Sequence, residues 1–142
     1  MFRRIISILA LLLTFMMQHS AFANGNPIQS LDRLPESRYM DLIEDYNGYM
    51  WIATMHGLAR YDGYNYFLFN HIEGNPETLL DNHVTSLANN GETLWVGTHK
   101  GLQYLSTGYK SFGKVMFPND RDVHVNSLLS LKDGRILVST SN

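Results

Sequence analysis

Short segments that alternate apolar and polar residues follow one another along the chain after residue 38. Three of them are YMDLIE (39–44), HVTSLA (83–88) and VNSLLSL (125–131). Each is followed by an Asx-Gly pair and by a second segment, which reads YMWIAT, TLWVGT or RILVST. Alternation predicts β-strands, and an Asx-Gly pair between strands favours a hairpin with a type I′ turn, in which both turn residues have positive φ. The pattern therefore predicts three hairpins.

Two of these hairpins continue into further strands. The third strand reads GLARYD (57–62) or GLQYLS (101–106), and the fourth reads YNYFLF (64–69) or KSFGKVMF (110–117). Asp62-Gly63 and the Ser-Thr-Gly at 106–108 supply turn residues between them. Helical periodicity is absent after the N-terminal region, apart from a short turn near PETLL (76–80).

The strand pattern is a repeat. NGYMWIATMHGLARY (47–61) occurs again as NGETLWVGTHKGLQYL (90–105) once one residue is inserted, and in reduced form as DGRILVSTSN (133–142). The shared positions hold Trp51, Trp95 and Leu137, then Thr54, Thr98 and Thr140, then Gly57 and Gly101. The threonines are 44 and then 42 residues apart. A period of about 40–50 residues built from short strands predicts an all-β fold of four-stranded antiparallel β-propeller blades.

The repeat resembles that of the two-component regulator propeller family, which reads approximately V-x-x-I-x-E-D-x-x-G-x-L-W-I-G-T-x-x-G-L-x-R-Y-D. The stretch DLIEDYNGYMWIATMHGLARYDGYNYFLF (41–69) follows it closely, with Ala53 in place of the usual Gly, which the second copy has as Gly97. The second copy lacks the acidic pair before its turn, and the third lacks the Trp. The loop NHIEGNPETLLDNHV (70–84) is also similar to the link between blades in this family.

The resemblance implies the extracytoplasmic sensor part of a transmembrane receptor. Such receptors carry two propellers, an immunoglobulin-like domain, one membrane span and a cytoplasmic output, usually a histidine kinase and sometimes a diguanylate cyclase. The parent would be dimeric and anchored in the inner membrane. We expect no enzymatic activity and no cofactor for this chain itself.

The expected domain organisation contains about two and a half blades, so the chain is expected to be a fragment of a longer receptor with an incomplete ring. Residues 24–38 lead into blade 1 at 39–70, an inter-blade loop follows at 71–82, and blade 2 covers 83–117. Residues 118–142 hold a second loop and a truncated blade 3. The rest of the parent propeller is therefore an expected partner, because an open ring leaves strand edges unpaired.

The N-terminal region has the pattern of a secretory signal peptide. Arg3 and Arg4 precede an apolar run of 13 residues (5–17), and Ala21-Phe22-Ala23 gives the small-x-small pattern of a cleavage site. An uncleaved anchor is the alternative, but the run is shorter than the roughly 20 residues of a membrane span. Residues 1–23 are therefore predicted to be removed, leaving an exported, periplasmic chain.

Charge and cysteine content narrow the function. After Ala23 the chain has nine basic and 13 acidic residues, a net charge of −4, so nucleic acid is not an expected partner. No cysteine is present, which excludes disulfides, thiolate nucleophiles and cysteine zinc sites. No H-x₃-H pair, calcium loop, G-x-S-x-G or phosphate-binding glycine loop occurs, so neither a metal site nor a catalytic residue is predicted.

The candidate ligand-binding residues lie in loops that propeller topology places on one face. These loops are the turns between second and third strands and the links between blades. They contain His56, His71, His83, His99, Lys100, Arg121 and His124. Histidine, lysine and arginine beside tyrosines suit a small hydroxylated or anionic ligand or a glycan, although loops are polar for reasons of solvation alone. An exported interaction scaffold and a periplasmic propeller lyase or hydrolase remain alternatives to a sensor.

Overall fold

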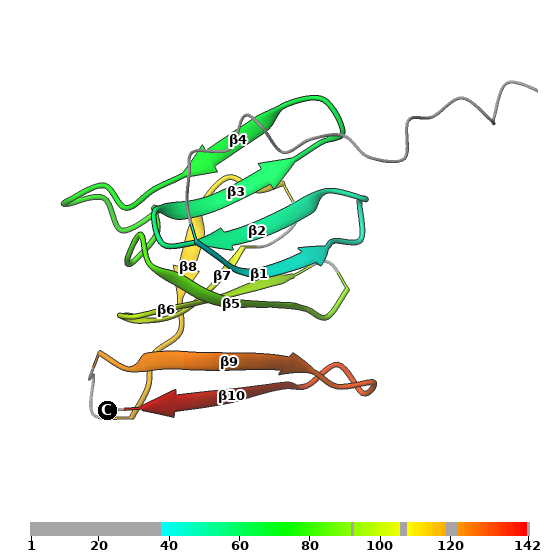
Figure 1. Cartoon of the computed structure of the whole chain (residues 1–142). Coiled ribbons are helices and arrows are strands. Elements are labelled where there is room, and N and C mark those ends of the chain that lie inside the picture. Colours follow the sequence, from blue (N-terminus) through cyan, green and yellow to red (C-terminus); the bar gives the residue numbers. More distant parts are fainter. Residues whose placement is uncertain (1–37, 92, 106–107, 119–121, 142) are drawn as a thin grey trace, which may run out of the picture. The chain divides into compact units, whose positions relative to one another are not determined.

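The computed structural model describes residues 38–141 except 92, 106–107 and 119–121 (Figure 1). The described residues belong to one compact unit of the chain, and every regular element in them is a β-strand. The predicted all-β class is confirmed. In this described part, no helix has the length and apolar character needed to cross a membrane.

The strands form three antiparallel sheets that follow the repeat. The first sheet has the order β1 (Tyr39–Glu44), β2 (Met50–Thr54), β3 (Gly57–Tyr61) and β4 (Tyr66–Phe69). The second has the order β5 (Val84–Asn89), β6 (Leu94–Thr98), β7 (Gly101–Leu105) and β8 (Phe112–Lys114). The third pairs β9 (His124–Ser130) with β10 (Ile136–Ser141). The predicted strands are confirmed to within two residues except at β8, which is much shorter than 110–117.

The three sheets share one register, including an irregularity in the same place. The pairing shifts between Tyr39 and Asp41 in the first sheet and between Val84 and Ser86 in the second. The third sheet has the matching shift between Ser139 and Thr140, opposite Val125. A β-bulge at a fixed position is a designed feature that bends the strand. The register therefore makes Val84 and Val125 equivalent, and likewise the residues before them, His83 and His124.

The hairpin turns differ from the sequence prediction. In the first sheet the Gly48 N–H donates to the Asp45 carbonyl at 3.0 Å, and Gly48 has φ 81°, but Asn47 has no positive φ. The third sheet has the same arrangement around Gly134, with no positive φ at Asp133. These loops are thus three-residue connections ending in a left-handed glycine, so the predicted type I′ turn is wrong at both places.

This loop geometry corrects the alignment of the repeats. The Asp45 N–H bonds the Tyr49 carbonyl across three residues, whereas the Asn90 N–H bonds the Thr93 carbonyl across two. Asn90 is therefore equivalent to Asp45 rather than to Asn47. Both accept a hydrogen bond from the indole of the repeated tryptophan, Trp51 Nε1 to Asp45 Oδ2 at 2.7 Å and Trp95 Nε1 to Asn90 Oδ1 at 3.0 Å.

The third sheet has replaced both partners of this bond. Its register places Leu137 at the tryptophan position and Leu131 at the position of Asp45. The tryptophan and its acceptor are thus replaced together in this sheet.

Asp45 also links the first sheet to the second. Its Oδ2 accepts a 2.5 Å hydrogen bond from the hydroxyl of Tyr109, which follows β7 and has φ 50°. Burial raises the pKa of Asp45, but hydrogen bonds from Trp51, Tyr109 and two backbone amides outweigh it and hold the pKa below its ordinary value. Burial and the bond to Asp45 raise the pKa of Tyr109.

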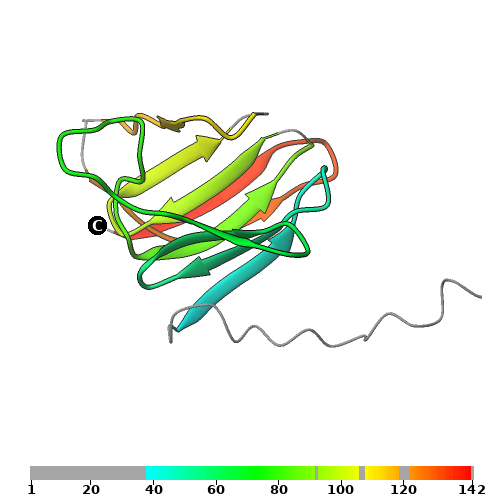
Figure 2. The ribbon, with the colours of Figure 1, turned by 90° about the horizontal axis from the view of Figure 1, so that it is seen from above.

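Neighbouring sheets pack through their first strands. β1 and β2 contact β5, and β5 and β6 contact β9, so that the sheets overlap when viewed from above (Figure 2). The main core is made of side chains from the first two sheets and the β4–β5 loop, including Trp51, Leu58, Leu79, Val84 and Leu105. Val125 of β9 is fully buried and lies against Gly97 of β6.

Candidate ligand-binding face

Two turns of identical construction present residues at one end of the sheets. Thr54 Oγ1 donates to the Gly57 carbonyl at 2.8 Å and accepts the His56 N–H at 3.0 Å. Thr98 does the same with Gly101 and Lys100, at 2.9 and 3.2 Å. Gly57 has φ 137°, and a Cβ there would lie 2.6 Å from the Phe69 carbonyl oxygen, so the turn requires glycine. Each turn thus exposes two variable residues, Met55-His56 and His99-Lys100.

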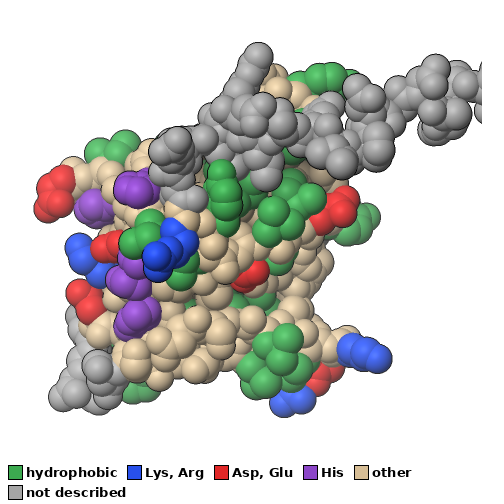
Figure 3. Space-filling view, viewed as in Figure 1, with side chains coloured by type: hydrophobic (Ala, Val, Ile, Leu, Met, Phe, Trp, Pro, Cys, Tyr) green, Lys and Arg blue, Asp and Glu red, His purple; other side chains and the backbone are tan. Residues whose placement is uncertain are grey.

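We call this end of the molecule the loop face. It consists of the β2–β3 turn (55–56), the β4–β5 loop (70–83), the β6–β7 turn (99–100) and the segment entering β9 (122–124). Figure 3 shows histidines, lysines and acidic residues gathered at this end of the strands.

Three of the candidate histidines form a column on the loop face. The imidazole rings of His83 and His99 stack with centroids 3.6 Å apart and an angle of 28°. The ring of His124 lies 4.1 Å from that of His99 on another side. The His99 N–H also donates to the His83 carbonyl at 3.3 Å, which fixes the turn against the start of β5. We refer to these three residues as the histidine column.

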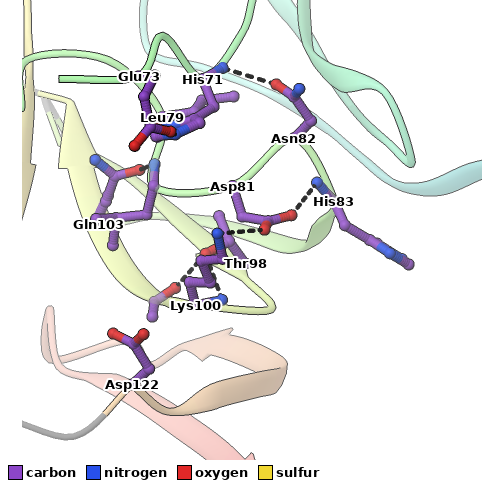
Figure 4. A network of polar contacts seen from close by, with 12 residues as sticks. His71, Glu73, Leu79, Asp81, Asn82, His83, Thr98, Lys100, Gln103 and Asp122 are labelled. Atoms are coloured by element: carbon purple, nitrogen blue, oxygen red, sulfur yellow. Dashed lines mark hydrogen bonds and ion pairs between the residues drawn. The ribbon is translucent and has the colours of Figure 1, made fainter. Parts of the chain in front are cut away.

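Few charges surround the column. Asp81 Oδ1 accepts the His83 N–H at 2.7 Å, and its Oδ2 lies 3.7 Å from Lys100 Nζ (Figure 4). Burial lowers the pKa of His99, His83 and His124 lower it further, and Asp81 opposes them without cancelling them. The surroundings therefore favour the neutral form of the His99 ring.

A second group of polar side chains connects the other two histidines. The Asn70 side-chain amide donates to the His56 carbonyl at 2.6 Å and to Asn82 Oδ1 at 3.3 Å. Asn82 Oδ1 also accepts the His71 N–H at 2.7 Å (Figure 4). His71 Nδ1 donates to the Leu79 carbonyl at 2.6 Å, which leaves Nε2 facing Glu73 at 3.4 Å. The loop beside it encloses a hollow of about 300 Å³ with a mainly apolar lining that includes Ile72, Pro76 and Leu80.

A buried glutamine holds the β4–β5 loop in place. Gln103 on β7 has no exposed surface. Its Oε1 accepts the Leu80 N–H at 2.7 Å and its Nε2 donates to the Thr78 carbonyl at 3.0 Å (Figure 4). The buried Gln103 side chain therefore anchors the loop that carries His71 and His83 to the second sheet by two hydrogen bonds.

The structure thus brings six of the seven candidates to one end of the sheets. His83, His99 and His124 are in ring contact, Lys100 lies next to them, and His56 and His71 are joined by Asn70 and Asn82. Arg121 lies outside the described residues. Within the described part of the chain, no group of three or more histidines and carboxylates has an arrangement that could hold a metal ion.

Sequence reasoning missed the equivalence of two column members. The signal was present, because HVTSL (83–87) and HVNSL (124–128) place a histidine before the same inner strand in consecutive repeats. It also missed Asp81, Asn70 and Asn82. No local sequence pattern predicts a role for them, because several of their partners lie in loops that come together only in the folded structure.

Comparison with known proteins supports the propeller assignment. The two component regulator propeller family matches residues 33–56. The extracellular domain of BT3049 from B. thetaiotaomicron, described as a hybrid two component system, has a TM-score of 0.65 at 18% identity, over 78% of this chain and 17% of that one.

Two further solved structures show weaker likeness. Both are extracellular domains of BT4673 from B. thetaiotaomicron, described in one case as a one component system and in the other as a hybrid two component system. Their TM-scores are 0.41 and 0.39 at 22% identity, each over 75% of this chain and 20% and 19% of theirs. The chain thus spans about a fifth or less of the structures it resembles, and no curated protein matches it significantly.

The family match covers the first strand, the Asp45–Trp51 pair and the first Thr-Gly turn up to His56, and the likeness to BT3049 covers 78% of the chain. Residues 33–56 therefore match the two component regulator propeller family, and the chain has the all-β blade fold of that extracellular domain.

Proposed function

We propose that this chain is a ligand-sensing, periplasmic propeller region of a transmembrane signalling receptor of the two-component type. The observation that carries the proposal is the family match at residues 33–56 within blades of the fold seen in the extracellular domain of BT3049. A signal-peptide pattern at residues 1–23 agrees with export. The chain contributes recognition, and a histidine kinase or diguanylate cyclase elsewhere in the parent receptor contributes the enzymatic output.

The loop face is the proposed site of recognition. Its edge carries His56, His99 and Lys100 on turns fixed by Thr54 and Thr98, and these side chains can donate and accept hydrogen bonds. Gln103 holds the β4–β5 loop between them in a fixed position. Preorganised polar groups on a rigid scaffold lose little entropy on binding, which suits recognition of a glycan or a small organic anion. Signalling would require the ligand to bind one receptor arrangement more tightly than another, because equal affinities shift no equilibrium.

Export can be tested with a reporter fusion. The full chain joined to alkaline phosphatase, which is active only after export, is expected to give activity in a bacterial host. The same fusion without residues 1–23 should give none. Equal activity in both fusions, or none in either, would remove the periplasmic assignment.

Recognition can be tested by calorimetric titration of the full chain with a panel of oligosaccharides and organic anions. We expect saturable binding of at least one compound, weakened at least tenfold by the double variant His56→Ala and His99→Ala. Lys132→Ala with Asp133→Ala is the matched control, because these exposed residues lie in the β9–β10 turn at the other end of the strands. Binding that both double variants weaken equally would show that the loop face is not the site.

A further inference from the structure

The histidine column crosses the boundary between the second and third sheets. His83 precedes β5 and His99 lies in the β6–β7 turn, both in the second sheet, whereas His124 begins β9 in the third. The ring of His99 contacts both of the others, at 3.6 and 4.1 Å. A charge on the His99 ring therefore lies in contact with the ring of His124 on the third sheet.

Besides the ion pair between Lys114 on β8 and Asp122 before β9, two hydrogen bonds between neutral groups cross this boundary. Thr85 Oγ1 donates to the Val125 carbonyl at 2.7 Å, and the Asn90 side-chain amide donates to the Gly134 carbonyl at 2.7 Å. Val125 packs against Gly97 between them. The boundary with the first sheet, by contrast, is held by carboxylates, since the Leu87 N–H donates to Asp41 Oδ2 at 2.8 Å and Tyr109 donates to Asp45.

Nearby acidic groups offset the charge of a protonated column only in part, because the His99 pKa stays lowered although Asp81 acts to raise it. Asp81 lies 3.7 Å from Lys100, and Asp122, on the segment entering β9, lies 3.9 Å from Lys114 on β8. Each of these carboxylates thus already has a lysine partner. Two imidazolium rings about 4 Å apart repel each other, and solvent screening reduces that repulsion.

We propose that His83, His99 and His124 form a proton-sensitive contact that holds the β9–β10 hairpin against the second sheet while the rings are neutral and releases it when the column takes up protons. This property goes beyond ligand recognition, because it requires no ligand. It gives the loop face two arrangements that differ in the position of His124 relative to His83 and His99. Stacking of neutral rings stabilises the closed arrangement, and repulsion between imidazolium rings favours the open one.

The first test measures the individual imidazoles of the full chain by NMR titration between pH 4.5 and 8.5. His99 is expected to titrate below the ordinary histidine value of about 6.5. His83→Asn and His124→Asn should each raise its pKa, because each removes a ring that lowers it. His56→Asn is the control and should leave it unchanged, because His56 lies in the β2–β3 turn of the first sheet. An ordinary pKa for His99, or one that neither column variant alters, would overturn the proposal.

The second test follows the sheets directly. The chain has no cysteine, so spin labels can be placed by Lys110→Cys in the second sheet's β7–β8 loop and Lys132→Cys in the third, both exposed. The distance distribution between the labels should broaden to longer distances at pH 5 relative to pH 8. A matched pair at Tyr64→Cys and Lys110→Cys, which spans the first and second sheets, should give the same distribution at both pH values.

Either of two outcomes at the Lys110–Lys132 pair would refute the proposal. One is an unchanged Lys110–Lys132 distribution at pH 5. The other is a change that persists fully in His99→Gln, since that variant removes the ring between His83 and His124. A change in both label pairs would show general unfolding rather than release of one hairpin and would likewise count against it.

Discussion

Replacing Gly97 by alanine tests whether the second and third sheets are in close contact. An ideal Cβ at this position would lie 2.6 Å from Val125 Cγ1 and 2.7 Å from Ser86 Oγ, with Val125 Cβ at 3.1 Å. Both neighbours are buried, and the β-branched Val125 has little rotamer freedom. Forcing a methyl group into a packed core costs about 1–3 kcal/mol, and the gain from a stiffer unfolded chain offsets at most about 1 kcal/mol of this.

We therefore expect Gly97→Ala to lower the free energy of unfolding by about 1–2 kcal/mol in urea titrations of the full chain followed by tryptophan fluorescence. When Val125→Ala is also present, Gly97→Ala should cost about 1 kcal/mol less than it does alone, because the smaller side chain leaves room for the added methyl group. A double-mutant cycle measures this difference. Ala53 is the matched position in the first sheet and is buried without exposure, so Ala53→Gly should instead create a small cavity and cost about 1 kcal/mol. A change below about 0.5 kcal/mol for Gly97→Ala, or no coupling with Val125, would refute the close packing.

Four further predictions concern hydrogen bonds within and between the repeats. Tyr109→Phe should cost about 1 kcal/mol in urea titrations, at the low end for a charged acceptor because Asp45 is partly solvated. Folding lowers the pKa of Asp45, so the ionised carboxylate contributes its full share to the free energy of unfolding above about pH 4, and this share is lost as the pH falls further. Asp45→Asn should reduce that pH dependence. Gln103→Ala should cost about 1–3 kcal/mol and speed hydrogen exchange in the β4–β5 loop, since it removes both hydrogen bonds from the part-buried Leu80 N–H and Thr78 C=O; unchanged exchange would contradict this. Asn90→Asp keeps an acceptor for the Trp95 indole and Asn90→Ala does not, while both lose the bond to the Gly134 carbonyl, so equal tryptophan fluorescence of the two variants would argue against the indole bond.

The sequence predicted the fold well because repetition and alternation are local signals. Strand positions and the Thr-Gly turns follow from patterns of a few residues, and the four-stranded sheets follow from the recurrence of these patterns every 42–44 residues; the structure confirms them. The turn type failed for a specific reason. An Asx-Gly pair can occupy a two-residue loop or the end of a three-residue loop, and only the pairing of Asp45 with Tyr49 decides between them.

The loop face was predictable only as a location. Topology placed the candidate residues on one end, but ring contacts such as that between His99 and His124 depend on how one sheet packs on the next. Carboxylates and amides such as Asp81 and Asn82 carry no local signature, because their partners are distant in sequence.

The two ends of each hairpin differ in how much change of length they accept. At the β1–β2 end the connection has three residues and at the β5–β6 end of the next sheet it has two, yet the strands beyond them keep one register. The opposite end is closed in both sheets by a threonine hydroxyl and a left-handed glycine that permit one length. Tyr46, 76% exposed in the longer connection, therefore marks the point where a fluorescent protein or affinity tag could be spliced into this chain with the loop face left intact.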